Sequence, residues 1–408
     1  MRRPAWRLAW ATALSGLALL AGCGGCSHGP GVGTGAPPSG VAALPPRTGR
    51  VPVRAVWVAR THYRTPADIA AIMHNCAAVG ANTVLWQVRG EGTVTYPSAL
   101  EPWAAQYEYR DPGFDPLAVA VQEAGRCGLR IEAWVNVMPG WKGDKPPPIG
   151  NQLYYAHPGW FLYDAQGRRQ ALNDQYVSLN PCDPEVRSHI VALCRELATR
   201  YAIDGIHLDY VRYAWDKTPN ALKRFPRDAR TVALFRQETG RRPDDDPPAW
   251  NAWRAEQITR LVADIRAMLR ATQPGCTLTA AVRSNPQAAY NDCLQDAVGW
   301  ARAGLVDALM PMAYTASPGE FAQDVTAYRW ACPGVRIVPG VGLYLLHDAG
   351  ALRSELQQCR AWGGDMALFS CESLFPSATG GRQGAEQVEQ QMRRQVLSEF
   401  VHPLTANR

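Results

Sequence analysis

The chain has 408 residues, a formal net charge of +6 at pH 7 and 19% charged residues. Its positive residues are scattered, so no basic run indicates a nucleic-acid-binding protein. The 14 tryptophans are more informative, because several lie next to the ends of predicted strands. Aromatic faces suit the apolar faces of sugar rings, although core packing is the ordinary role of any single tryptophan.

The first 22 residues have the pattern of a secretion signal. Arginines precede a mostly apolar run, Leu8–Leu20, which is too short for a membrane-spanning helix. The following residues, LAGC, resemble a bacterial lipobox, which implies lipidation of Cys23 and a firm lipid anchor in a membrane. Because Gly24 rather than aspartate follows, the resemblance favours the periplasmic face of the outer membrane. An ordinary signal peptide with a chance cysteine is the alternative.

The rest of the chain divides into a tether and one domain. Residues 23–50 are rich in glycine, proline and serine, which predicts a flexible tether. Residues 51–400 contain no second linker, and roughly 350 residues can form a single barrel domain.

Eight apolar, β-rich runs alternate with helical patterns in this domain. Strands that alternate with amphipathic helices predict βα units and a parallel sheet. Eight such units fit a closed barrel better than an open sheet, so we predict an α/β protein with a single (β/α)8 TIM barrel. The predicted strands are Arg54–Arg60, Asn82–Arg89, Arg130–Val137, Gly205–Tyr210, Thr277–Arg283, Asp307–Tyr314, Arg336–Leu343 and Asp365–Cys371.

The predicted helices begin with a repeated signal, a capping side chain directly before a proline. Such a cap accepts hydrogen bonds from free backbone N–H groups, and proline is favourable at the first helical position. The longest predicted helix covers about residues 248–271, where apolar residues recur at helical spacing. The predicted caps are Thr65, Asp115, Asp183 and Ser317.

Two predicted βα loops are long, one after strand 3 (about residues 138–182) and one after strand 4 (about residues 214–247). Long loops at the C-terminal face of a barrel build substrate clefts. Aromatic residues in the first loop, including Trp141 and Tyr176, favour a groove for a polymer.

Eleven cysteines are present, and export would permit disulfides. Cys76 and Cys127 lie near the ends of successive predicted helices, as do Cys332 and Cys359, so we expect these two pairs to be linked. No cysteine or histidine spacing supports a zinc site, and no motif requires a metal or an organic cofactor.

Asp209 is the first catalytic candidate, because it lies at the end of predicted strand 4, and the C-terminal strand ends of a barrel carry the chemistry. An N-cap or an ion-paired loop acid is the alternative. If Asp209 points into the barrel, His207 lies one layer below it and can orient it. A core histidine with satisfied hydrogen bonds is the alternative for His207.

Alternation also places Asn136, Trp134 and Glu132 inside the barrel on strand 3. Glu132 is then deep enough to need a partner, which Arg89 or Arg54 can supply. Polar and aromatic groups from several strand ends converge on one face, as in a barrel active site. The predicted substrate-binding residues are Gln87, Arg89, Trp134, Asn136, His207, Arg283, Tyr314 and Tyr344.

Several motifs follow one another in an order that resembles the glycosyl-hydrolase-like 10 family of bacterial lipoproteins, over about residues 51–375. The resemblance implies a TIM-barrel hydrolase that cleaves glycan strands such as peptidoglycan. The motifs are RAVWV at 54–58, NTVLWQVR at 82–89, DPGFDPL at 111–117, HPGW at 157–160 and DGIHLDY at 204–210.

The chain also departs from the family pattern. Tyr210 replaces the second acid of a common Asp-Asp pair, and Thr93 replaces an acid in the loop after strand 2. Glu132 and Asn180 occupy positions where the family tends to have histidine and aspartate.

Glycoside hydrolysis usually needs two carboxyl groups. The partner of Asp209 is open between Glu372, favoured by its position at the end of strand 8, and Glu91, favoured by its place in the family motif. Either can instead be a solvated or ion-paired loop acid.

The sequence therefore predicts a glycoside hydrolase that acts on bacterial cell-wall glycan strands by carboxylate acid/base catalysis. Its expected partners are a glycan polymer and a membrane, reached through the N-terminal lipid. A non-catalytic glycan-binding envelope lipoprotein is the alternative, because the departures at Thr93 and Tyr210 are compatible with the loss of one acid.

Overall fold

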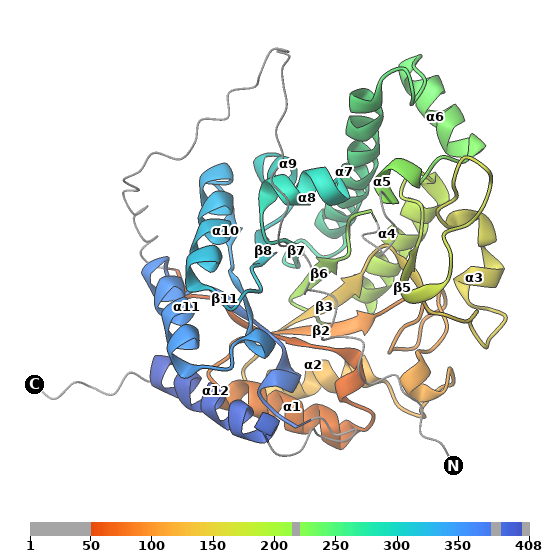
Figure 1. The fold of residues 1–408 in the computed structure, drawn as a ribbon. Coiled ribbons are helices and arrows are strands. Elements are labelled where there is room, and N and C mark those ends of the chain that lie inside the picture. The colour runs from red at the N-terminus through yellow and green to blue at the C-terminus, as the bar shows by residue number, and fades with distance from the viewer. Residues whose placement is uncertain (1–49, 214–220, 377–384, 402–408) are drawn as a thin grey trace, which may run out of the picture. The chain divides into compact units, whose positions relative to one another are not determined.

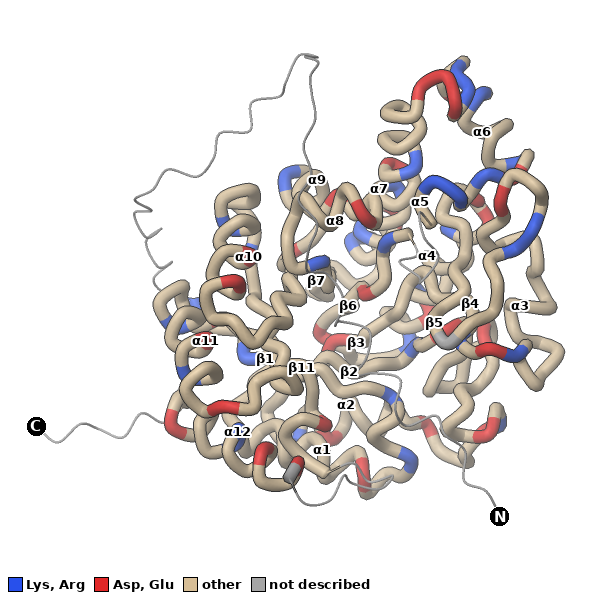
Figure 2. Tube along the Cα trace, in the orientation of Figure 1, with Lys and Arg blue, Asp and Glu red and all other residues tan. Residues whose placement is uncertain are grey.

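The computed structural model describes residues 50–213, 221–376 and 385–401 (Figure 1). The chain divides into two compact units, Met1–Pro46 and Arg47–Arg408, and all described residues belong to the second. The predicted signal peptide, the lipidation site Cys23 and nearly all of the tether therefore lie outside the described residues. Figure 2 shows positive and negative residues interspersed along the described chain.

The main sheet is entirely parallel and runs in the order β10-β11-β1-β2-β3-β6-β7-β8-β9. Its strands coincide closely with the predicted runs. They are β1 (Arg54–Val58), β2 (Thr83–Arg89), β3 (Arg130–Asn136), β6 (Gly205–Asp209), β7 (Thr277–Arg283), β8 (Ala308–Met312), β9 (Arg336–Ile337), β10 (Gly340–Gly342) and β11 (Met366–Phe369).

The two ends of this order, β9 and β10, are the halves of one predicted strand. Only Val338 and Pro339 separate them. The Val338 N–H donates to the Leu309 carbonyl of β8 (2.9 Å), and the Pro339 carbonyl accepts from Ala367 of β11 (2.8 Å). Proline has no N–H to donate, which accounts for the interruption. The split strand joins both edges of the sheet, so the predicted eight-position TIM barrel is confirmed.

Helices surround the strands, as Figure 1 shows. Each predicted cap accepts a backbone N–H at the start of its helix, and Thr65 forms a full capping box with Asp68. The helices are α1 (Pro66–Ala78), α2 (Pro116–Arg126), α3 (Leu153–Ala156), α4 (Pro184–Arg200), α5 (Ala221–Arg224), α6 (Ala229–Thr239), α7 (Pro247–Thr272), α8 (Pro286–Cys293), α9 (Ala297–Arg302), α10 (Pro318–Ala331), α11 (Ala349–Ala361) and α12 (Ala385–Val401). Short 3-10 helices are η2 (Arg60–His62), η3 (Ala105–Tyr107), η4 (Pro158–Trp160), η5 (Leu343–Leu345) and η6 (Cys371–Ser373).

The hydrophobic core has two parts. A large cluster fills the space between the strands and the helices. A small inner cluster, which includes Trp57, Leu85, Trp134 and Met310, fills the barrel itself. This inner layer supports the residues at the C-terminal ends of the strands.

The two long βα loops are present. The loop after β3 contains α3 and a two-stranded antiparallel sheet of β4 (Pro139–Gly143) and β5 (Asn173–Ser178). The described part of the loop after β6 contains α5 and α6. Across the described ranges, no helix combines the length and apolarity needed to cross a membrane.

Neither predicted disulfide is present, so the pairs Cys76–Cys127 and Cys332–Cys359 were wrong. All nine cysteines in the described part of the chain are free thiols. Cys127 Sγ lies 3.7 Å from His74 Nδ1. Cys76 instead interacts with Cys371, which follows the eighth strand position. Closure of the barrel brings the first and last βα units together.

Candidate functional site

Asp209 lies at the C-terminal end of β6, beside Asn136 of β3, where catalytic groups of barrels lie. Its carboxylate accepts from the Tyr210 N–H (2.6 Å), and Arg212 Nη1 lies 3.7 Å away. Burial raises the pKa of Asp209, and the charge of Arg212 together with the Tyr210 N–H only partly offsets this effect. Asp209 is therefore a carboxyl group suited to holding a proton.

The residue after Asp209 has an unusual backbone. Tyr210 lies in the left-handed region with φ of 50°, which is uncommon for a non-glycine residue. The Arg212 guanidinium lies 4.3 Å from the centre of the Tyr210 ring. The Tyr176 ring meets the Tyr210 ring edge-on, with 4.9 Å between the ring centres. The long loop after β3 thus covers the end of β6 with an aromatic side chain.

Glu91 follows β2, two strand positions from β6. It forms a buried ion pair with Arg60, whose backbone N–H also donates to Gln87 Oε1 (3.1 Å). Burial raises the pKa of the Tyr176 phenol, and the charges of Glu91 and Asp209 both add to this effect. Glu91 and Asp209 thus both act electrostatically on Tyr176, and the strands that precede or carry them, β2 and β6, lie two positions apart in the barrel.

Glu372 lies on the other side of the barrel. In the closed strand order, β11 and β6 are four positions apart and hence opposite each other. The Glu372 side chain is 50% exposed, and its Oε2 lies 3.1 Å from His62 Nε2. The structure thus groups Glu372 with His62 rather than with Tyr176.

His207 is completely buried below this layer. Its Nε2 accepts from the Trp57 indole N–H (3.0 Å), and its Nδ1 lies 2.9 Å from Thr279 Oγ1. Because the Thr279 hydroxyl donates to Glu132 Oε2 (2.6 Å), His207 must donate from Nδ1, which assigns its tautomer. Burial lowers the pKa of His207 to about 3, so the ring is neutral. Both nitrogens are occupied, as expected for a satisfied core histidine.

Glu132 has different partners from those we expected. It accepts from Thr279 and Thr277 of β7, and burial raises its pKa. Arg54 instead donates to the Gly80 carbonyl (2.6 Å). The predicted arginine partner was wrong, because threonine hydroxyls from the neighbouring strand already satisfy the carboxyl group.

Arg89 is also fully buried. It pairs with Glu101 (2.7 Å) and donates to backbone carbonyls of Asn136, Val137 and Pro139. These bonds stabilise the start of the long loop after β3. Its guanidinium is therefore occupied within the protein.

The remaining predicted ligands on β2 and β3 are nearly inaccessible. Trp134 donates from its indole to Asn136 Oδ1 (2.9 Å), and Gln87 accepts from Arg60. Arg283, at the end of β7, is half-buried and lies 3.3 Å from Asp292. Asn136 is the register partner of Asp209, so Asn136 and the Trp134 indole that binds it support this end of β6.

An aromatic cluster lies at the ends of β8, β10 and β11. Tyr314 stacks on Phe369 at 5.1 Å, and Tyr344 and Trp57 meet the cluster edge-on. Gly342 makes room for this cluster, because a Cβ there would lie 2.7 Å from Tyr314 Cβ. Phe369 was not among the predicted site residues, although it is an aromatic residue at the end of a predicted strand.

Within the part of the chain that the structure describes, no group of three or more histidine, cysteine or acidic side chains is arranged to hold a metal ion. The chemistry that these residues can support is proton transfer and ring stacking. Asp209 is a buried carboxyl group with a raised pKa, and Glu91 is an ion-paired carboxylate that follows a strand two positions away. Aromatic faces lie at the ends of β8, β10 and β11.

Comparisons with known proteins agree with this architecture. The model of the family described as "Glycosyl hydrolase-like 10" matches residues 52–350. The chain is 27% identical over 281 residues to "Glycosyl hydrolase DigH" of Escherichia coli (strain K12), covering 62% of this chain and 59% of that protein. It is 26% identical over 300 residues to "Glycosyl hydrolase YngK" of Bacillus subtilis (strain 168), covering 64% of this chain and 51% of that protein. The match thus spans about three fifths of the length of the first of these relatives.

Solved structures show a similar fold at low identity. "Alpha-L-fucosidase isoenzyme 2 from Paenibacillus thiaminolyticus" has a TM-score of 0.60 at 14% identity, covering 86% of this chain and 49% of that one. The glycoside hydrolase domain of PgaB (BpsB) from Bordetella bronchiseptica has a TM-score of 0.58 at 15% identity, covering 84% of this chain and 99% of that one. Both likenesses concern the fold.

Proposed function

The chain belongs to the glycosyl hydrolase-like 10 family, and we propose that it hydrolyses glycosidic bonds in peptidoglycan-like glycan strands of the bacterial cell wall. The observation that carries this proposal is Asp209, a buried carboxyl group with a raised pKa at the C-terminal end of a barrel strand. Such a group suits a general acid, which must hold a proton until it transfers it to the leaving oxygen.

Glu91 is the favoured second carboxyl group. It follows β2, two strand positions from Asp209, whereas Glu372 ion-pairs with His62 and follows β11, four positions away. In this proposal Asp209 protonates the glycosidic oxygen, and Glu91 activates water or attacks the sugar carbon. Arg60 holds Glu91 in place through an ion pair. This ion pair must weaken before the Glu91 carboxylate can act as a base or a nucleophile.

The aromatic cluster supports a sugar substrate. Tyr314, Tyr344 and Phe369 are half-buried side chains at the barrel end, where a ring face can stack on a sugar. The proposed glycan is peptidoglycan-like because of the family resemblance in the sequence. A lipid anchor on Cys23, at the periplasmic face of the outer membrane, would keep the domain near this polymer.

The test is hydrolysis of purified, amidase-treated glycan strands by the full chain. New reducing ends should appear with the wild type and fall by at least 100-fold in Asp209→Asn, as expected for loss of a general acid. Glu91→Gln and Glu372→Gln are compared side by side, and the variant that retains wild-type turnover is removed as the second acid. Glu256→Gln, a change in a half-exposed surface carboxylate, is the matched control.

The alternative is a non-catalytic glycan-binding protein. Tyr210 favours it, because an aromatic ring packed against Arg212 stands where the family often has a second acid. Binding of glycan strands without product, unchanged in Asp209→Asn, would establish this alternative and refute the hydrolase.

A further inference from the structure

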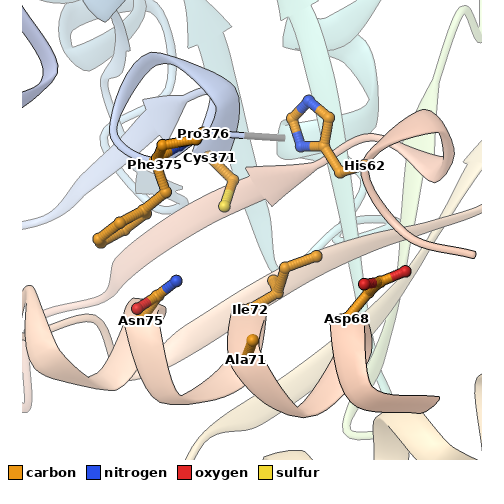
Figure 3. A pocket seen from close by; sticks show the side chains of 8 residues that line it. All are labelled: His62, Asp68, Ala71, Ile72, Asn75, Cys371, Phe375 and Pro376. Atoms are coloured by element: carbon orange, nitrogen blue, oxygen red, sulfur yellow. The ribbon is translucent and has the colours of Figure 1, made fainter. Parts of the chain in front are cut away.

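A cavity of about 310 Å³ lies between α1 and the segment after β11. His62, from the segment after β1, forms one wall, and Ile72 and Asn75 of α1 form another. Figure 3 shows the Cys371 side chain pointing toward α1 within this cavity. A small molecule that enters the cavity therefore meets a thiol.

Two side chains act on the Cys371 sulfur. Cys76, fully buried on α1, is one, and His62, which lines the same cavity as Cys371, is the other. His62 also forms an ion pair with Glu372, so a carboxylate orients the base that faces the thiol. This is the arrangement of an activated nucleophile, in which a base contacts the nucleophile and a third group holds the base.

The charges agree with this geometry. The interactions with Cys76 and then with His62 outweigh burial and lower the pKa of Cys371 to about 6. Burial lowers the pKa of His62, but its bonds to Cys371 and Glu372 outweigh burial and raise it to about 9. The other groups that face this site are Cys127, near Cys76, and Asp68, which lines the cavity. At neutral pH the pair is a thiolate and an imidazolium.

We propose that Cys371 and Cys76 form a peroxide-reactive dithiol site, in which Cys371 is the attacking cysteine and Cys76 the resolving cysteine. This dithiol site is separate from the site that holds Asp209, and its reactivity does not depend on glycan hydrolysis. It rests on the cavity, on the contact between the two sulfurs and on the His62–Glu372 pair beside them.

The chemistry has two balanced steps. The Cys371 thiolate attacks one oxygen of hydrogen peroxide, the O–O bond breaks, and the leaving hydroxide takes the His62 proton to form water. Cys371 is then a sulfenic acid. The Cys76 sulfur attacks the Cys371 sulfur, the S–O bond breaks, and the hydroxyl group leaves with the Cys76 proton as a second water. Two thiols are oxidised to one disulfide, and one peroxide is reduced to two waters.

The other buried cysteines are suited to remain inert. Burial raises the pKa of Cys194 and of Cys182 to about 12, so neither is a thiolate at neutral pH. The new bond would also link α1 to the turn after β11. It would therefore join the first and last βα units of the barrel covalently.

The first experiment measures the pH dependence of alkylation by iodoacetamide in the full-length wild type, with each cysteine followed by peptide mass spectrometry. The rate at Cys371 should reach half its maximum near pH 6, because its pKa lies there. At pH 6 a thiol ionised to about one half reacts roughly tenfold faster than one of pKa about 8.5, after its weaker nucleophilicity is included. Cys194 is the internal control and should stay unmodified. A half-maximum at pH 8 or above overturns the proposal.

The second experiment treats the protein with one equivalent of hydrogen peroxide and maps peptides without reduction. A Cys76–Cys371 peptide should dominate, and Cys76→Ser should instead trap Cys371 as a dimedone adduct. His62→Gln should move the alkylation midpoint of Cys371 upward by at least one pH unit. Peroxide oxidation of Cys371 no faster than that of Cys194 in the wild type refutes the site without relying on any variant.

Discussion

Replacing Glu101 with glutamine is expected to destabilise the protein by about 3 kcal/mol at pH 7, because it removes the carboxylate that faces the buried Arg89 charge. Burial alone would raise the pKa of Glu101. The charge of Arg89 and hydrogen bonds from His189 and Arg89 outweigh burial and lower it from 4.5 to about 2. A difference of this size between the folded and unfolded pKa of Glu101 corresponds to roughly 3 kcal/mol in the free energy of unfolding.

The sign of the pH dependence follows from the lowered pKa. The carboxylate stabilises the fold above about pH 4.5, and this contribution is lost as the pH falls toward about 2. Urea unfolding of the wild type and Glu101→Gln should therefore show a large gap at pH 7 that shrinks at pH 3. Glu399→Gln, in an exposed pair with Arg353, is the control and should cost under about 1 kcal/mol.

Two results would refute this reasoning. A loss below about 1 kcal/mol at pH 7 would mean that the Glu101 carboxylate does not balance the charge of Arg89. A loss of equal size at pH 7 and pH 3 would mean that the charge of Glu101 is not what stabilises the fold. Either result would reopen the earlier prediction that Arg89 binds substrate.

Two further predictions follow from the barrel interior and its end. Thr279→Val removes the acceptor for His207 and a donor to Glu132. Thermal or urea unfolding should therefore show a free energy of unfolding lower by about 2–4 kcal/mol. A decrease under about 1 kcal/mol would contradict the assigned hydrogen bonds. If Asp209 is the general acid, kcat/KM should fall with rising pH as Asp209 loses its proton, and burial should place this fall above the usual range of aspartate. A wild-type profile with no alkaline fall would exclude Asp209 as the general acid.

Much of the fold could be predicted from the sequence, because hydrophobic alternation and proline-marked caps are local signals. The split of the seventh strand was missed, although Pro339 in the middle of an apolar run was a warning. The disulfide prediction failed for a topological reason. It paired helices that are consecutive in the chain, whereas closure of the barrel makes Cys76 a neighbour of Cys371.

The site was predictable as a set of inward-facing positions, but its contacts were not. Alternation correctly placed His207 and Glu132 inside the barrel. Their hydrogen-bond partners lie on other strands, up to 150 residues away in sequence, and no local pattern encodes such pairings. The same limit applies to Arg89, whose position suggested a ligand but whose partners make it a support for the loop after β3.

The glycines of β10 have a consequence for how this barrel can vary. An added Cβ atom would lie 2.6 Å from the Pro311 carbonyl oxygen at Gly340 and 3.0 Å from the Tyr314 Cα at Gly342. These are backbone atoms, so a smaller side chain at position 314 would not make room for a side chain on β10. Relatives that keep this close approach are therefore expected to keep glycine at both positions.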